Sequence, residues 1–212
     1  MGTLGFAVAI LMFCLLGAIS WSLDFADPVE AILTGQVPPT SEAFSHYTNI
    51  LPAYYAIDSA LIIGWLVGWI GVAVLVRERN RWLGGIVLVL GLAGPLLDFL
   101  ENEISWALIG VSQRSIPVPV GWLIGWQVVR QLSYLLPFSV AVLAGAGLWG
   151  QKTLARVTAG IGTVGVAVAL AGLYIPDLWM ATQLWWPIWF AALGLLLWQR
   201  RMDFSQQETE SH

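Results

Sequence analysis

The chain alternates long apolar segments with short polar ones, and we interpret six of the apolar segments as transmembrane helices. These segments cover residues 4–23, 52–76, 82–101, 121–149, 156–174 and 183–198. A helix crosses the hydrocarbon core, about 30 Å thick, with about 20 apolar residues, because each residue adds about 1.5 Å. The pattern predicts an all-α integral membrane protein, with one bundle of six transmembrane helices over residues 1–201.

The first apolar segment, residues 4–23, has a second interpretation as a signal peptide, with Ala18-Ile19-Ser20 as its small-residue cleavage site. Signal peptides begin with a positively charged region. No Lys or Arg precedes this segment. We therefore expect an uncleaved transmembrane helix.

Residues 24–51 form the longest polar interruption, which contains His46 and several acidic residues. Asp27-Pro28-Val29-Glu30 is typical of a helix start, with Asp as N-cap, Pro at the first helical position and Glu at the third. We expect residues 24–51 to form an extracytoplasmic segment, either an ordered cap over the bundle or a solvated connector. The polar tail, residues 202–212, is expected to be disordered and cytoplasmic.

The basic residues predict how the helices are oriented, because Lys and Arg gather in short cytoplasmic loops. Seven of the nine fall on one predicted side of the membrane: Arg77, Arg79, Arg81, Lys152, Arg156, Arg200 and Arg201. Only Arg114 and Arg130 fall on the other. This distribution places both termini in the cytoplasm, and we expect a bacterial inner membrane or a plasma membrane.

Composition agrees with this class and excludes several functions. The chain is 58% hydrophobic and 10% charged, whereas a soluble domain has about 25% charged residues. The single cysteine, Cys14, rules out an intramolecular disulfide, and with two histidines there is no set of ligands for a zinc site or a bis-histidine haem. The only lysine, Lys152, lies in a predicted loop, which excludes a rhodopsin-type Schiff base. No basic patch indicates nucleic acid, and the sequence identifies no cofactor.

Four ionisable residues are predicted at similar depth in three helices, Asp58, Asp98, Glu101 and Arg130. Counted from the cytoplasmic end of each helix, they lie roughly 24–28 Å up, just inside the outer interface. Asp177 comes out slightly higher, at roughly 32 Å. Charged groups at membrane depth are costly unless they are paired or hydrated, so they are candidates for a functional site.

Neighbouring polar residues extend this candidate site. Tyr55 precedes Asp58 by one helical turn, and Gln127 and Tyr134 flank Arg130 at spacings of three and four. Arg130 keeps its charge, so we expect it to pair with Asp98 or Glu101. The remaining acids would be protonated, hydrated or bound to a cation. The predicted ligand-binding residues are Asp58, Asp98, Glu101, Arg130, Tyr55, Tyr134 and Gln127.

Small residues and tryptophans are interpreted as structural. Gly64-x-x-x-Gly68 and Gly121-x-x-x-Gly125 are predicted to allow close helix packing inside the bundle. The tryptophans toward the outer side, Trp126 among them, are interpreted as an interfacial aromatic belt. His46 is expected at the surface.

No catalytic set and no metal site is evident, so we favour a non-enzymatic function. The leading hypothesis is a membrane protein that binds a small molecule or lipid, or an accessory subunit of a larger membrane complex. The alternatives are a proton- or cation-coupled transporter with Asp98 and Glu101 as coupling groups, and a lipid-modifying enzyme with Glu101 as general acid or base. Ion pairs that merely fix helix register are a further interpretation of the same residues.

Overall fold

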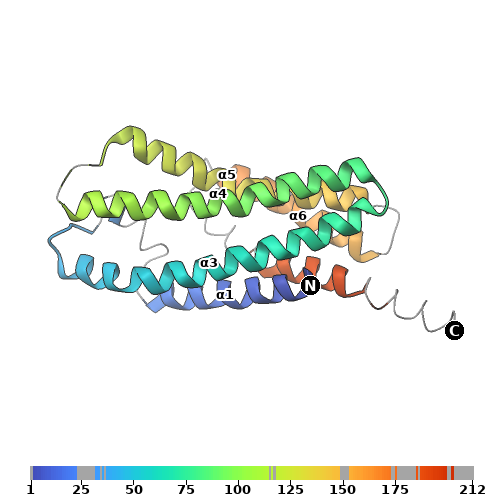
Figure 1. Ribbon diagram of the computed structural model, residues 1–212, viewed down its shortest axis with the longest axis horizontal. Coiled ribbons are helices and arrows are strands. Elements are labelled where there is room, and N and C mark those ends of the chain that lie inside the picture. Colours follow the sequence, from blue (N-terminus) through green and yellow to red (C-terminus); the bar gives the residue numbers. More distant parts are fainter. Residues whose placement is uncertain are drawn as a thin grey trace.

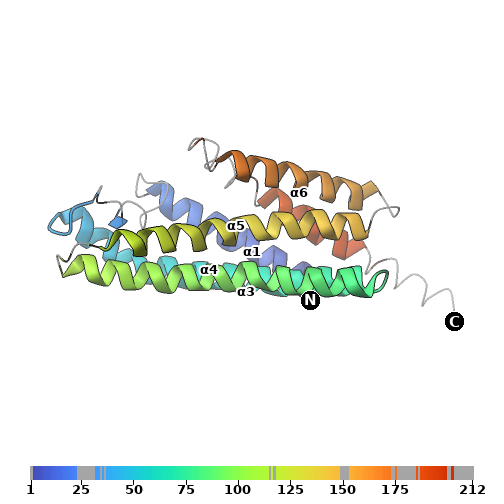
Figure 2. The same ribbon diagram turned by 90° about the horizontal axis from the view of Figure 1, so that it is seen from above.

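The molecule is an elongated bundle of α-helices, as the computed structural model in Figures 1 and 2 shows. The structure describes residues 2–22, 32–33, 35, 37–114, 116, 118–148, 153–172, 175, 185, 187–199 and 202. All regular secondary structure in these ranges is helical.

The labelled helices are α1 (Gly2–Ser22), α3 (Glu42–Arg77), α4 (Arg81–Gln113), α5 (Val120–Gly147) and α6 (Thr153–Gly172). Four of them, α1, α3, α4 and α5, are long and apolar enough to cross a membrane. Two shorter apolar helices cover Thr153–Val168, within α6, and Pro187–Gln199. The prediction of an all-helical membrane-type protein is therefore confirmed.

Helix α3 begins earlier than predicted, at Glu42 instead of residue 52. Ser41 is its N-cap, and the Ser41 hydroxyl accepts a hydrogen bond of 3.1 Å from the backbone N–H of Phe44. This cap satisfies one of the unpaired N–H groups of the first turn. The last part of the predicted polar interruption is thus helical, and exposed His46 lies within it. The predicted helix start at Asp27, and the polar tail after residue 202, lie outside the described residues.

Helices α3 and α4 are longer than a bilayer is thick. The 36 residues of α3 and the 33 residues of α4 correspond to lengths of about 54 Å and about 50 Å. The hydrocarbon core measures only about 30 Å. In α4 the helix continues without interruption past Glu101, where the predicted apolar segment ends, to Gln113.

The main core joins α1, α3, α5 and the helix Pro187–Gln199 through aromatic side chains. Trp189 lies with its ring centroid 5.3 Å from that of Trp69 and 5.2 Å from that of Phe138. Phe190 stacks on Phe6 with the centroids 5.6 Å apart. All five side chains are fully buried, and they fix the last helix against the rest of the bundle.

A second core occupies the other end of α3 and α4. Phe44, Tyr47 and Leu51 repeat along one face of α3, and they pack with residues of α4 and α5. The buried members of this core are Ile32, Leu33, Val37, Phe44, Tyr47, Leu51, Leu108, Ile109 and Trp126. The bundle therefore has two apolar cores along its length.

Helix α1 packs closely on α3 because glycines face each other. A Cβ atom placed on Gly64 would lie 2.7 Å from the backbone oxygen of Gly5, and one placed on Gly68 would lie 2.6 Å from the ring of Phe6. The predicted packing role of Gly64 and Gly68 is confirmed. The same prediction for Gly121 and Gly125 is wrong, because both are exposed and a Cβ on either would meet no atom within 4 Å.

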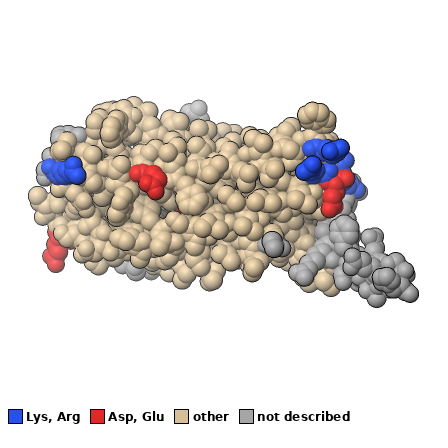
Figure 3. Space-filling view, viewed as in Figure 1, with Lys and Arg blue, Asp and Glu red and all other residues tan. Residues whose placement is uncertain are grey.

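The turn between α3 and α4 carries Arg77, Arg79 and Arg81 and defines what we call the basic end of the bundle. Figure 3 shows basic side chains gathered at this end and a largely uncharged face between the two ends. Gly2 lies close to Gly71 and Leu197, so α1 begins, and the helix Pro187–Gln199 ends, on the side of the basic end. Lys152, Arg200 and Arg201 lie outside the described residues.

Candidate functional site

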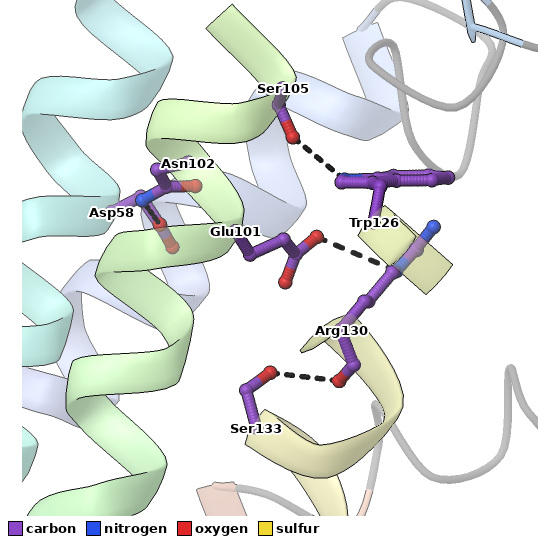
Figure 4. Close-up of polar contacts among 7 residues, drawn as sticks. All are labelled: Asp58, Glu101, Asn102, Ser105, Trp126, Arg130 and Ser133. Carbon is purple, nitrogen blue, oxygen red and sulfur yellow. Dashed lines mark hydrogen bonds and ion pairs between the residues drawn. The ribbon is translucent and has the colours of Figure 1, made fainter. Parts of the chain in front are cut away.

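Helix α4 supplies the central residues of a polar cluster that links three helices. Asp98, Glu101, Asn102 and Ser105 are spaced by three and four residues, so they lie along one face of α4. This face is turned toward the space between α3 and α5 (Figure 4). We call the set Asp58, Asp98, Glu101, Asn102, Ser105, Trp126, Arg130 and Ser133 the polar cluster.

On one side, α4 is hydrogen-bonded to α3. The amide nitrogen Nδ2 of Asn102 donates to Oδ2 of Asp58 over 2.5 Å. Both residues are half-buried. A hydrogen bond to a charged carboxylate is shorter and stronger than one between neutral groups.

On the other side, α4 forms an ion pair with α5. Glu101 Oε1 lies 3.7 Å from Nε of Arg130, and the two side chains are only 12% and 10% exposed. The guanidinium carbon of Arg130 also lies 5.1 Å from the ring centroid of Trp126. A cation over an indole face is attracted by the negative face of the ring. Arg130 is thus held by a carboxylate and by an aromatic ring.

Two serines complete the polar contacts with α5. The indole Nε1 of Trp126 donates to the hydroxyl of Ser105 over 2.8 Å, and both side chains are buried. The hydroxyl of Ser133 donates to the backbone oxygen of Arg130 over 2.8 Å. Buried polar groups need such partners, because an unmade hydrogen bond away from water is costly.

Asp98 lies in the middle of the cluster. Its carboxyl group is close to those of Asp58 and Glu101 and to the hydroxyl of Ser133. Three carboxyl groups therefore lie close together in the cluster, and Glu101 forms the ion pair with Arg130. All three acidic residues are largely removed from solvent, the Glu101 side chain being only 12% exposed, and Arg130 is buried.

In the described ranges, no group of three or more His, Cys, Asp or Glu side chains is placed to hold a metal ion.

The structure brings together four of the seven predicted site residues, Asp58, Asp98, Glu101 and Arg130, in the polar cluster. Tyr55 packs edge-on against Trp106, with ring centroids 5.5 Å apart, and Tyr134 packs against the main core. Gln127 is exposed, and a ligand-binding role for it stays a prediction. Asp177 lies outside the described residues.

Four members of the cluster were not expected as site residues from the sequence. Trp126 was interpreted as part of an interfacial belt, yet it is 2% exposed and contacts Arg130 and Ser105. Asn102, Ser105 and Ser133 were not assigned to the site. The spacing was informative, because Trp126 precedes Arg130 by four residues and Ser133 follows it by three.

Comparison with known protein families, with curated proteins and with solved structures finds no match. The geometry of the site is therefore the basis for assigning a function.

Proposed function

We propose that this protein is a polytopic membrane protein that binds a positively charged small molecule at the polar cluster. The proposal rests on one observation: the carboxyl groups of Asp58, Asp98 and Glu101 lie close together between α3, α4 and α5, where Glu101 pairs with Arg130. Excess negative charge inside an apolar bundle is costly, and a bound cationic group offsets it.

Aromatic rings close to the cluster support binding of an organic cation. The aromatic rings of Trp126 and Trp106 lie nearby in the same end of the bundle, against Arg130 and Tyr55 respectively. Carboxylates together with aromatic rings are the groups that bind organic cations.

The proposed orientation has six transmembrane helices and both termini in the cytoplasm, with the polar cluster nearer the extracytoplasmic face. The argument is the arginine-rich turn between α3 and α4, since short basic loops stay in the cytoplasm.

Single cysteines in a Cys14→Ala background test this orientation. The exposed residues Ser45, at the start of α3, and Arg79, in the basic turn, are the two positions to replace. The Ser45→Cys variant should react with an impermeant maleimide added to intact cells, and the Arg79→Cys variant should react only after lysis. The reverse pattern would refute this orientation.

The binding proposal is tested by thermal unfolding of the purified full chain in mild detergent. A panel of primary amines, quaternary ammonium ions and inorganic cations is added at constant ionic strength. We expect at least one organic cation to raise the unfolding temperature, since a ligand at 100 times its Kd adds about 2.7 kcal/mol to the unfolding free energy.

Matched variants make this test specific. Asp98→Asn and Glu101→Gln remove a carboxylate from the cluster, whereas Glu103→Gln removes an exposed one two residues along the same helix. The stabilisation should disappear in the first two and persist in the third. Equal stabilisation of all variants, or none by any cation, would refute the proposal.

A proton-coupled transporter is the second candidate, and the position of Asp98 favours it. Its carboxyl group is close to two others, and neighbouring carboxyl groups can share a proton. Uptake of protons by vesicles that contain the protein, driven by a substrate gradient and abolished by Asp98→Asn, would support this candidate over a binding protein.

A further inference from the structure

A groove at the basic end lies far along the bundle from the polar cluster. It has a volume of about 910 Å³ and is lined by α3 and α4. Pockets that hold small-molecule ligands measure roughly 300–1,000 Å³. The groove is therefore large enough for part of a lipid molecule.

Two apolar stripes form the walls of the groove. On α3, Ile70 and Val74 are 41% and 56% exposed and lead along one face to Arg77. On α4, Ile86 and Val89 are similarly exposed and lead back to Trp82. Each stripe is roughly 10 Å long, which suits the upper part of an acyl chain.

The floor of the groove is open because of glycine. Gly84 holds the two helices together, since a Cβ placed there would lie 2.5 Å from Arg77 Cα. The neighbouring Gly85 is exposed, and a Cβ placed on it would meet no atom within 4 Å. Gly85 thus leaves space beside the close contact that Gly84 makes between α4 and α3.

Positive charge surrounds the mouth of the groove. Arg77 and Arg81 line it, and the turn from Arg77 to Arg81 carries three arginines and one acid, Glu78. Trp82 is 86% exposed at the same level. Exposed Trp is typical of the membrane interface, and basic pockets between transmembrane helices bind anionic headgroups.

We propose that this groove binds an anionic phospholipid, with the headgroup at Arg77 and Arg81 and an acyl chain between the two apolar stripes. The positive charges of Arg77 and Arg81 favour a negatively charged headgroup. The apolar walls favour a molecule with an acyl chain, a phospholipid, over a free anion.

Native mass spectrometry of the delipidated full chain tests the proposal, with phosphatidylglycerol and phosphatidylcholine titrated separately. We expect phosphatidylglycerol to bind more tightly. The double variant Arg77→Gln/Arg81→Gln should lose about fivefold in affinity for each arginine removed. Arg114→Gln, which removes an exposed arginine at the other end of α4, should have no effect.

The groove itself is tested by filling its floor. Gly85→Leu should abolish specific binding, whereas Gly110→Leu should not, because Gly110 also has open space but lies in the other half of α4. If Gly85→Leu unfolds the protein, Val89→Trp obstructs the same stripe. Millimolar inorganic phosphate should leave the lipid bound.

Three results would overturn the proposal. They are equal binding of the two lipids, equal losses in Arg114→Gln and the double arginine variant, and normal binding by correctly folded Gly85→Leu and Val89→Trp. Displacement of the lipid by phosphate would equally refute a role for the apolar walls.

Discussion

The contact between α1 and α3 and the contacts among α3, α4 and α5 hold helices together in different ways. The first depends on Gly5, Gly64 and Gly68, where backbones approach so closely that a Cβ atom would collide. The second adds the polar cluster to close glycine contacts such as that of Gly84 with Arg77. Lipid is as apolar as a leucine side chain, so apolar burial alone does not drive helices together within a bilayer. Close backbone packing and polar pairing are other means of association, and the contacts of α4 combine the two.

The two regions should differ in their response to substitution. At the glycine contact, any larger side chain should destabilise the protein, whatever its polarity. In the polar cluster, the change in stability should depend more on the sign of the removed charge than on the shape of the new side chain.

The largest effect is expected for Arg130→Gln, which removes the cation and leaves three carboxyl groups facing one another. Removing one partner of a buried ion pair destabilises by roughly 3–5 kcal/mol. The unfolding free energy, measured by SDS titration in mixed micelles, should fall by about this amount. Asp98→Asn, which reduces the excess negative charge, should be neutral or stabilising. Equal losses in the two variants would contradict the charge argument.

An intermediate effect is expected for Gly64→Ala. The new methyl group would lie against the backbone of Gly5 and Ala9, which cannot move aside as a side chain can. Overpacking of this kind costs roughly 1–3 kcal/mol, and the same SDS titration measures it. Gly125→Ala is the control, because its methyl group meets open space and Ala favours the helix. A loss in the control as large as in Gly64→Ala would show that packing is not the cause.

The smallest effect is expected for Trp126→Phe. This change removes the hydrogen bond to Ser105 and weakens the contact with Arg130. We expect a loss of about 1 kcal/mol in unfolding free energy. Trp122→Phe is the control, since Trp122 lies one turn earlier in α5 and is 56% exposed. A double-mutant cycle with Ser105→Ala isolates the hydrogen bond, and a coupling energy of zero would refute its contribution.

The sequence predicted the meeting of Asp58, Asp98, Glu101 and Arg130 because the rise of a helix is fixed. Counting residues from the predicted cytoplasmic end of each helix is enough to place side chains at the same height. The direction in which a side chain points around the helix axis does not follow from such a count. Trp126 and Gln127 precede Arg130 by four and three residues, so spacing alone admits both. Packing of α5 on α4 decides that Trp126 is buried and Gln127 exposed.

The sequence contains signals for the early start of α3, but the polar composition of the same segment led to the prediction of a later start. Ser41 is a good N-cap, and Phe44, Tyr47 and Leu51 repeat with helical spacing. The surrounding charged and polar residues favoured a loop instead. Conversely, Gly121 and Gly125 have the spacing of a packing motif, but the structure places no neighbour against them.

Adjacent residues of α4 reach different neighbouring helices, Asn102 contacting Asp58 on α3 and Glu101 contacting Arg130 on α5 (Figure 4). Successive residues of an α-helix are separated by about 100° around its axis. A twist of α4 that brings one of these side chains closer to its partner draws the other away. The two contacts therefore oppose torque in both senses and set the angle at which α4 stands between its neighbours.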